Sequence, residues 1–185
     1  MKATGIVRRI DDLGRIVIPK EIRRTLRFRE ADPVEIFTGT DGEIILKKYS
    51  PVGELGEFAR QYADALAQTS GHIVCITDRD RVIAVSGGDR KSLLGKEVSR
   101  GLQNVIEDRM NLCTQRSDKE YVDITAGQTD NQEDYTWQAV SPILCEGDAI
   151  GAVIITSRDA GSRCTETESK LAHSAAAFLG KQMES

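Results

Sequence analysis

Basic side chains are concentrated at the start of this 185-residue chain. Residues 1–29 contain nine Lys or Arg and three Asp or Glu, a formal charge of +6, whereas the whole chain carries −4. The remaining residues therefore hold a charge of −10. Clustered cations neutralise phosphates, so this distribution favours a polyanion-binding segment at one end of an acidic chain. A solvated charged face is the alternative, and charge alone does not decide between the two.

Cysteine and histidine are the other side chains that could carry chemistry. No two cysteines form a CxxC pair; they are Cys75, Cys113, Cys145 and Cys164. With only His72 and His173 as further ligands, no metal site or cofactor is predicted. Cys75 and Cys145 lie in apolar runs, where a buried thiol is usually inert. Cys113 lies near a polar segment and Cys164 precedes a helix. We therefore expect no enzyme.

One hairpin and one short helix are predicted within the basic segment. Residues 6–10 alternate as a strand would, residues 11–14 are turn formers, and residues 15–18 form a second apolar strand. Pro19 suits the first position of a helix, where its missing N–H costs nothing. Residues 20–26 then supply about two helical turns, which are short and strongly basic.

A second hairpin is predicted where strands 34–38 and 43–48 flank residues 40–42, because Asp-Gly is a favoured hairpin-turn pair.

A unit of about 50 residues without disulfide or metal buries too little apolar surface to offset its chain entropy. Two chains could interleave their strands into one small barrel, which would also protect the strand edges. Its shared core would contain Ile6, Ile10, Ile16, Ile18, Ile36 and Phe37.

The run GIVRRIDDLGRIVIPKEIRRTLRFREADPVEIF resembles the AbrB-type swapped-hairpin DNA-binding domain. The resemblance covers residues 1 to about 50, and LGRIVIPKEIRRTL is its most specific part. It implies an all-β-dominated swapped-hairpin barrel formed by an interleaved dimer. Ala31 stands where this family commonly has Gly in a turn. Because Ala tolerates positive φ poorly, we expect a local difference in that turn.

The same resemblance implies that arginines of the hairpin and helix bind double-stranded DNA. In this chain these residues are Arg8, Arg15, Arg23 and Arg24, with Arg9 and Lys2 as outlying helpers. Guanidinium groups on one surface suit phosphates and some base edges. A surface with few base-reading side chains favours recognition of DNA shape, and hence A·T-rich sites. The alternative for each arginine is a solvated or ion-paired side chain; Arg27 and Arg29 could pair with Glu21, Glu30 or Asp32.

Residues 51–185 alternate helix and strand signals that are typical of one antiparallel sheet with helices on a face, an α+β domain. A linker helix is predicted over 51–68, with apolar positions at Leu55, Phe58, Ala59, Tyr62 and Leu66. Further strands are predicted over 72–77, 81–86, 135–145 and 149–157, and a helix over 97–110.

The chain closes on a predicted helix that Thr165 and Glu168 open as a capping box. The polar segment 111–134 is expected to be mobile, apart from a candidate strand at 121–124, and it could cover a pocket.

The segments TDRDRVIAVSG and SPILCEGDAIGAVIITS resemble the first and last hairpins of a GAF domain. This resemblance implies a GAF-like sensory or oligomerisation domain over 69–185, with flanking helices. The NKFDE-type pattern that accompanies cyclic-nucleotide-binding GAF domains does not occur in the sequence. Cyclic nucleotides are therefore not expected, and whether another small molecule binds is left open.

The two resemblances together cover essentially the whole chain and indicate a family of sporulation regulators. They imply a nucleoid-associated activator and repressor of late forespore genes, assembled as a tetramer from two swapped dimers. No apolar run approaches the roughly 20 residues of a membrane span, and the N-terminus has no continuous apolar core of a signal peptide. A cytoplasmic protein without membrane contact is expected.

Two other classes of protein use the same folds. AbrB-type hairpins occur in antitoxins, whose toxin-neutralising tails are short and disordered, whereas residues 51–185 show folded periodicity. One family of GAF-fold proteins reduces free methionine sulfoxide with cysteines, which would make the four cysteines candidates for catalysis. A DNA-binding regulator is the preferred interpretation.

Overall fold

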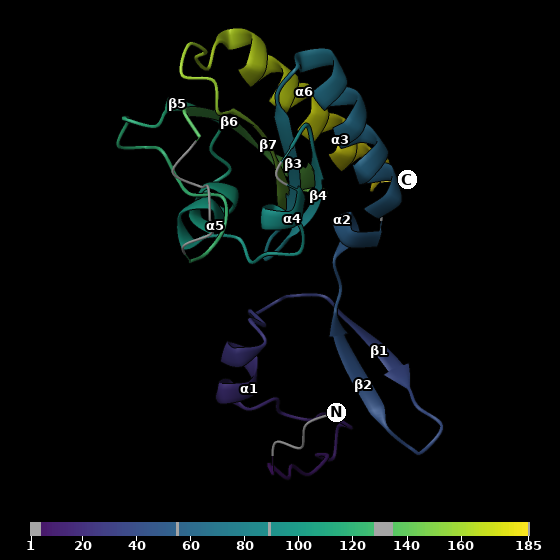
Figure 1. Ribbon diagram of the computed structural model, residues 1–185. Helices are drawn as coiled ribbons and strands as arrows, with labels where there is room; N and C mark the ends of the chain where they lie inside the picture. Colours follow the sequence, from purple (N-terminus) through teal and green to yellow (C-terminus); the bar gives the residue numbers. More distant parts are fainter. Residues whose placement is uncertain (1–4, 55, 89, 128–134, 185) are drawn as a thin grey trace. The chain divides into compact units, whose positions relative to one another are not determined.

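The computed structural model describes residues 5–54, 56–88, 90–127 and 135–184 of the chain. It divides into two compact units, Met1–Tyr49 and Ser50–Ser185 (Figure 1). In the described part of the chain, no helix combines the length and the apolar character that crossing a membrane would require.

The first unit contains the helix α1 (Lys20–Thr25) and a hairpin of β1 (Val34–Thr38) and β2 (Ile44–Lys48). The two strands pair antiparallel, from Val34 opposite Lys48 to Thr38 opposite Ile44. In the turn, Gly42 has a φ of +78° and the Gly39 N–H donates to the Glu43 carbonyl at 2.8 Å. The prediction of a helix followed by a second hairpin is therefore confirmed.

The first predicted hairpin is not formed within the single chain. Residues 5–18 contain a turn at 12–14 and no strand. The turn itself is closed, since the Gly14 N–H donates to the Asp11 carbonyl and the Asp11 N–H to the Arg15 carbonyl, both at 3.0 Å. Strand geometry needs a ladder on at least one side, and the described residues of this chain supply none to 6–10 and 15–18.

Apolar side chains of the first unit lie at its surface. Of the fourteen large hydrophobic residues exposed in the described chain, ten belong to residues 6–46. They include Val7, Ile10 and Ile36, which are 86%, 62% and 67% exposed. Pro19 is the one residue that is buried among the described residues of this unit. The unit therefore holds an apolar surface that one chain alone does not cover.

Ala31 adopts a φ of +63°, the left-handed conformation that glycine adopts readily. The turn thus keeps a left-handed residue at this position, and other contacts hold it in place. The Asp32 carboxylate accepts the Arg29 N–H at 2.7 Å and pairs with the Lys48 ammonium at 3.0 Å. These contacts hold the turn against β2, although Ala31 is less favourable than glycine in the left-handed conformation.

The second unit is built on a five-stranded antiparallel sheet in the order β4-β3-β7-β6-β5. Its strands are β3 (Ile73–Asp78), β4 (Val82–Ser86), β5 (Leu112–Gln115), β6 (Trp137–Cys145) and β7 (Asp148–Ser157). The two predicted hairpins are confirmed as β3–β4 and β6–β7.

Segment 111–134 was not predicted correctly. It contributes β5 as an edge strand, and its described part contains three buried residues, Thr114, Ile124 and Thr125. Residues 121–124 form no strand; the adjacent Thr125 makes an isolated bridge with Val98. Residues 128–134 lie outside the described part, so the expected cover over a pocket is not described there.

Helices cover both faces of this sheet (Figure 1). Helices α3 (Gly56–Ser70) and α6 (Glu166–Gln182) lie on one face, and α4 (Arg90–Leu93) and α5 (Arg100–Glu107) on the other. A short helix α2 (Pro51–Glu54) precedes α3, so the predicted linker helix is found on both sides of Leu55, which lies outside the described residues. Helix α5 is shorter than predicted because Ser99 caps it: the Ser99 hydroxyl accepts the Leu102 N–H at 3.0 Å.

Each face of the sheet has its own hydrophobic core. Under α3 and α6 the core contains Trp137 together with Ala59, Ala63, Ala172 and Ala176. Small residues allow the helices to approach the sheet closely; a Cβ at Gly180 of α6 would meet the Leu144 carbonyl oxygen. The predicted capping box of α6 is confirmed: the Thr165 N–H donates to the Glu168 carboxylate at 2.9 Å.

Replacing Ala31 with glycine is expected to stabilise the first unit. A left-handed φ costs a non-glycine residue about 1–2 kcal/mol, and the larger unfolded-state entropy of glycine offsets about 0.5–1 kcal/mol of the gain. We expect a net stabilisation of about 0.5–1 kcal/mol, measured by calorimetry of the full chain at one fixed concentration. Ala65→Gly on the exposed side of α3 is the control, and it should destabilise the second unit by a similar amount. A loss of stability in the Ala31→Gly variant would contradict this account.

Candidate nucleic-acid interface

Helix α1 presents two adjacent arginines to solvent. Arg23 and Arg24 occupy its last turn, are exposed, and form no ion pair with a described residue. Their charges suit the negative end of the helix dipole, and Glu21 suits its positive end. Buried Pro19 fixes the start of the helix. The two guanidinium groups are therefore positioned on a short rigid element and available to an anion.

Arg15 lies at the end of the first turn, where Asp11 organises it. The Asp11 carboxylate accepts the backbone N–H groups of Leu13 and Arg15 at 3.0 and 2.8 Å. Its second oxygen accepts the Arg15 Nε–H at 2.8 Å. Arg15 keeps its remaining guanidinium nitrogens outward, because 67% of its side chain is exposed. Asp11 thus orients an arginine without covering it.

The hydrogen bonds that Arg15 donates hold the pKa of the Asp11 carboxyl below its ordinary value. The backbone N–H of Arg15 is the largest cause and its guanidinium the second. Asp11 is fully exposed, so solvent screens this interaction and it contributes little to global stability. Its effect is local: the carboxylate stays ionised and keeps the turn closed.

Arg8 and Arg9 are exposed on the segment before this turn and have no ion-pair partner among the described residues. The sequence predicted that Arg8 and Arg15 lie on the two paired strands of a hairpin. They do not, because the described residues 5–18 form no ladder with one another. Lys2, the other predicted helper, lies outside the described residues. The interface is therefore described for five of its six predicted residues: Arg8, Arg9, Arg15, Arg23 and Arg24.

Arg27 and Arg29 lie in the segment that follows α1 and are half-buried. The Arg27 carbonyl accepts the Lys48 ammonium at 3.0 Å, and the same ammonium pairs with Asp32. Arg27 is in the left-handed region with a φ of 56°. This region is a structural connection between α1 and the second hairpin, which distinguishes these two arginines from the exposed ones.

Sequence reasoning missed two residues that shape this interface. Asp11 is the acceptor of the Asx turn, and the signal for it was the run Asp-Asp-Leu-Gly. Lys48 is the partner of Asp32 across 16 positions of sequence, which no local pattern could have indicated. Lys47, on the same strand, lies over the Phe37 ring at 4.5 Å from its centroid.

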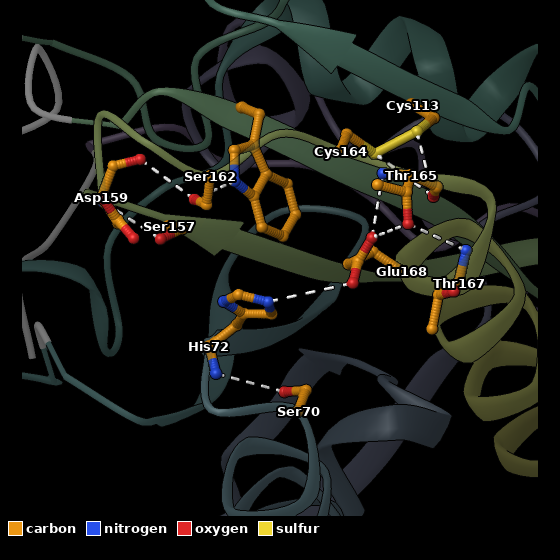
Figure 2. A network of polar contacts seen from close by, with 11 residues as sticks. Ser70, His72, Cys113, Ser157, Asp159, Ser162, Cys164, Thr165, Thr167 and Glu168 are labelled. Atoms are coloured by element: carbon orange, nitrogen blue, oxygen red, sulfur yellow. Dashed lines mark hydrogen bonds and ion pairs between the residues drawn. A yellow bond between two sulfur atoms is a disulfide. The ribbon is translucent and has the colours of Figure 1, made fainter.

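Polar contacts in the second unit converge at the start of α6 (Figure 2). Cys113 and Cys164 form a disulfide, which the sequence analysis did not predict. The Trp137 indole donates its N–H to the Ser162 hydroxyl at 2.7 Å, and the His72 Nε2 lies 3.9 Å from the Glu168 carboxylate. Burial raises the pKa of the Glu168 carboxyl, but the hydrogen bonds that it accepts from Thr165 and from the backbone outweigh burial, so that its pKa lies below the ordinary value.

A surface pocket of about 550 Å³ lies beside β4 and α4. Arg90, Lys91 and Asp64 line it together with the backbone at Gly87 and Gly88. The Ser86 hydroxyl donates to the Asp64 carboxylate at 2.6 Å, so that the acid is already engaged.

The second unit has the fold of a GAF domain. It is similar to the GAF domain of an Acinetobacter phosphoenolpyruvate-protein phosphotransferase, with a TM-score of 0.55 and 10% identity over 74% of this chain and 84% of that one. The first unit is of the AbrB type. The transition state regulatory protein AbrB of Bacillus subtilis (strain 168) is 61% identical over 111 residues, which are 60% of this chain and 92% of that protein. Residues 7–54 also match the family described as antidote-toxin recognition MazE, bacterial antitoxin.

An AbrB-type basic unit joined to a GAF-fold unit defines a transcriptional regulator. The chain belongs to the family described as Stage V sporulation protein T C-terminal, transcription factor, which matches residues 54–184. The Stage V sporulation protein T of Bacillus subtilis (strain 168) is 54% identical over 184 residues, covering 100% of this chain and 99% of that protein. The family predicted from the sequence is confirmed.

The Asp11 turn is expected to survive acidification further than an isolated aspartate would allow. Because the folded pKa is lowered, the contribution of Asp11 is fully present above the ordinary carboxyl value and is lost as the pH falls through the folded value. Nuclear magnetic resonance titration of the Leu13 and Arg15 amide signals measures this. Asp11→Asn should abolish the titration. A midpoint at or above the value of an unstructured aspartate would contradict the assignment.

Proposed function

We propose that the protein is a DNA-binding regulator of late sporulation genes that acts in the forespore as activator and repressor. Its first unit binds double-stranded DNA through Arg8, Arg15, Arg23 and Arg24, with Arg9 and Lys2 beside them. The GAF-fold unit joins copies of the chain and receives a signal. The observation that carries the proposal is a group of exposed arginines at one end of an otherwise acidic chain: Arg8, Arg23 and Arg24 form no ion pair with a described residue, and the Arg15 side chain stays 67% exposed beside Asp11.

Phosphate contacts supply most of the affinity in this proposal. Arg8, Arg23 and Arg24 offer guanidinium groups that no described residue pairs with, and these groups bind phosphate oxygens and release the counterions of DNA. Few other side chains near them suit base edges, so recognition depends on groove width and bendability. A·T-rich sites, with a narrow minor groove and strong negative potential, fit this mode of binding.

The first unit acts as an interleaved dimer in this proposal. Exposed large hydrophobic residues of this unit, Ile10, Ile16 and Ile36 among them, form the apolar surface that a second chain would cover. Residues 6–10 and 15–18, to which the described residues supply no ladder, gain strand partners when strands from two chains alternate in one barrel. Such a barrel doubles the number of arginines at one DNA surface, because each chain contributes the same set.

A tetramer forms when the GAF-fold units of two such dimers pair through α3 and α6. The apolar stripe of α6 divides into two parts. Ala172, Ala175, Ala176 and Leu179 are buried against the sheet of their own unit and are not available to a partner. Phe178 is 41% exposed. Its ring lies 5.2 Å from the Tyr62 ring and 6.0 Å from the Phe58 ring of α3.

This aromatic cluster of Phe58, Tyr62 and Phe178 suits a helix-to-helix interface, because aromatic side chains provide large contact areas with few rotatable bonds. Joining two DNA-binding dimers makes the second DNA contact intramolecular. The gain in avidity is about a hundredfold or more when the two sites are correctly spaced.

An antitoxin is the second candidate, favoured by the match of residues 7–54 to an antitoxin family. Toxin-neutralising tails of that class fold on binding, whereas residues 50–185 form a unit with two hydrophobic cores of their own. A cysteine-dependent reductase is less favoured. Cys75 is fully buried, and burial together with the neighbouring carboxylates raises the pKa of the Cys145 thiol.

DNA affinity is expected to fall steeply with salt concentration, and Arg23→Ala should reduce the slope of log K against log salt by about one. Arg100→Ala, at the exposed start of α5, removes the same charge from the second unit and should leave the slope unchanged. Titrations of labelled A·T-rich and G·C-rich duplexes at several salt concentrations measure both the slope and the preference. Equal affinity for the two duplexes would count against shape recognition.

The melting temperature of the first unit is expected to rise with protein concentration, since association and folding are coupled in an interleaved dimer. Ile10→Asp should prevent association, because strand alternation places Ile10 in the shared core. Val7→Asp is the matched control, on the opposite strand face, and should leave association intact. Calorimetry and sedimentation of the full chain test this. A concentration-independent transition would refute the dimer.

Phe178→Lys is expected to halve the molar mass of the assembly, because it places a charge in the aromatic cluster while leaving the buried side of α6 intact. Ala177→Lys adds the same charge at a neighbouring exposed position and should leave the mass unchanged. Light scattering at a fixed concentration compares the two variants. A Phe178→Lys variant that kept the full mass would show that the interface lies elsewhere.

A further inference from the structure

A disulfide joins the edge of the GAF-fold sheet to the start of its last helix. Cys113 lies in β5, whose one neighbour is β6, and Cys164 lies two residues before α6. Their Cα atoms are 5.7 Å apart, and 51 positions separate them in sequence (Figure 2). The bond therefore closes a long loop that contains β5, β6 and β7.

The two bonded cysteines are accessible, and the other two are not equivalent to them. Cys113 is exposed and Cys164 is half-buried. Cys75 is fully buried in β3. The Cys145 thiol has a pKa raised by burial and by the nearby carboxylates of Glu146, Glu184 and Asp148. The thiolate is the species that exchanges with disulfides, so the raised pKa disfavours exchange at Cys145, which is half-buried like Cys164 but free. Cys113 and Cys164 are accessible and lie close enough to bond to each other.

A DNA-binding regulator works in a compartment where small thiols keep protein cysteines reduced, and this step rests on the proposed function. Disulfides of intracellular proteins are usually transient and belong to redox sensing or catalysis. An accessible bond in that setting is exposed to reduction and to re-oxidation. Its two states differ in whether β5 is covalently held to the segment before α6.

The segment between β7 and α6 has a second, non-covalent anchor at its other end. The Trp137 indole binds Ser162, and the Thr136 hydroxyl donates to the Ser157 and Asp159 carbonyls, both at 3.1 Å. At the α6 end the capping box follows directly after Cys164. Reduction would therefore leave the core anchored through Trp137 and release β5, the strand with a single ladder neighbour.

We propose that Cys113 and Cys164 form a reversible thiol–disulfide modification site for low-molecular-weight thiols and disulfides. The Cys113 thiolate attacks one sulfur of a small disulfide, the bond between its two sulfurs breaks, and one thiolate leaves. The Cys164 thiolate then attacks the Cys113 sulfur, closes the protein disulfide and expels the second thiolate. The two cysteines lose two electrons, the small disulfide gains them, and the two cysteine protons end on the two small thiols.

The test uses the reduced full chain and glutathione disulfide as the probe. Alkylation followed by mass spectrometry should show that Cys113 and Cys164 become protected together, while Cys75 and Cys145 stay reduced. Reduced glutathione in excess should reverse the change. Hydrogen exchange of residues 112–115 and 158–168 should be about tenfold or more slower in the oxidised form, because the bond restricts local opening.

Cys145→Ser is the matched control and should respond as the unchanged chain does. Cys113→Ser and Cys164→Ser should each hold glutathione as a mixed disulfide at the remaining cysteine and show no slowing of exchange. Two thiols that stay reduced in glutathione disulfide, or a bond that resists excess glutathione, would overturn the proposal. DNA binding is measured separately: loss of DNA binding with intact redox cycling would refute the proposed function and leave the modification site standing.

Discussion

The first unit carries more apolar surface than one chain can cover, and this constraint shapes the rest of the molecule. Ile10, Ile16 and Ile36 are all more than half exposed, although each belongs to a segment with strand-like alternation. About 25 cal/mol is gained for each Å² of apolar surface removed from water, so such residues strongly favour a second chain. In the proposed dimer, the burial that folds the unit also brings arginines from two chains to one DNA surface.

The second unit covers the apolar surface of its sheet with helices of the same chain. Its sheet is covered on both faces, with α3 and α6 over one core and α4 and α5 over the other (Figure 1). It can therefore keep its fold whatever the state of association of the first unit. In the proposed assembly, the smaller unit therefore depends on a partner for its structure and the larger unit does not.

Elements with local signals could be predicted from the sequence, and those that depend on distant contacts could not. The hairpin at 34–48, the helix after Pro19 and the capping box of Thr165 each follow from residues a few positions apart. The edge strand β5 was missed because it is only four residues long, Leu112–Gln115, and is paired by β6 far along the chain. Likewise, the cysteine count gave no indication that Cys113 would meet Cys164.

The arginines of the candidate interface divide in the same way. Exposure of Arg23 and Arg24 follows from their place in the last turn of a short helix. The orientation of Arg15 depends on Asp11, an acidic residue that charge counting treats only as a reduction of the basic charge.

Trp137 is the single tryptophan of the chain, and it is fully buried against α3 and α6. Intrinsic tryptophan fluorescence therefore reports on the GAF-fold unit alone. Unfolding of this unit can be followed separately from that of the first unit without any added label.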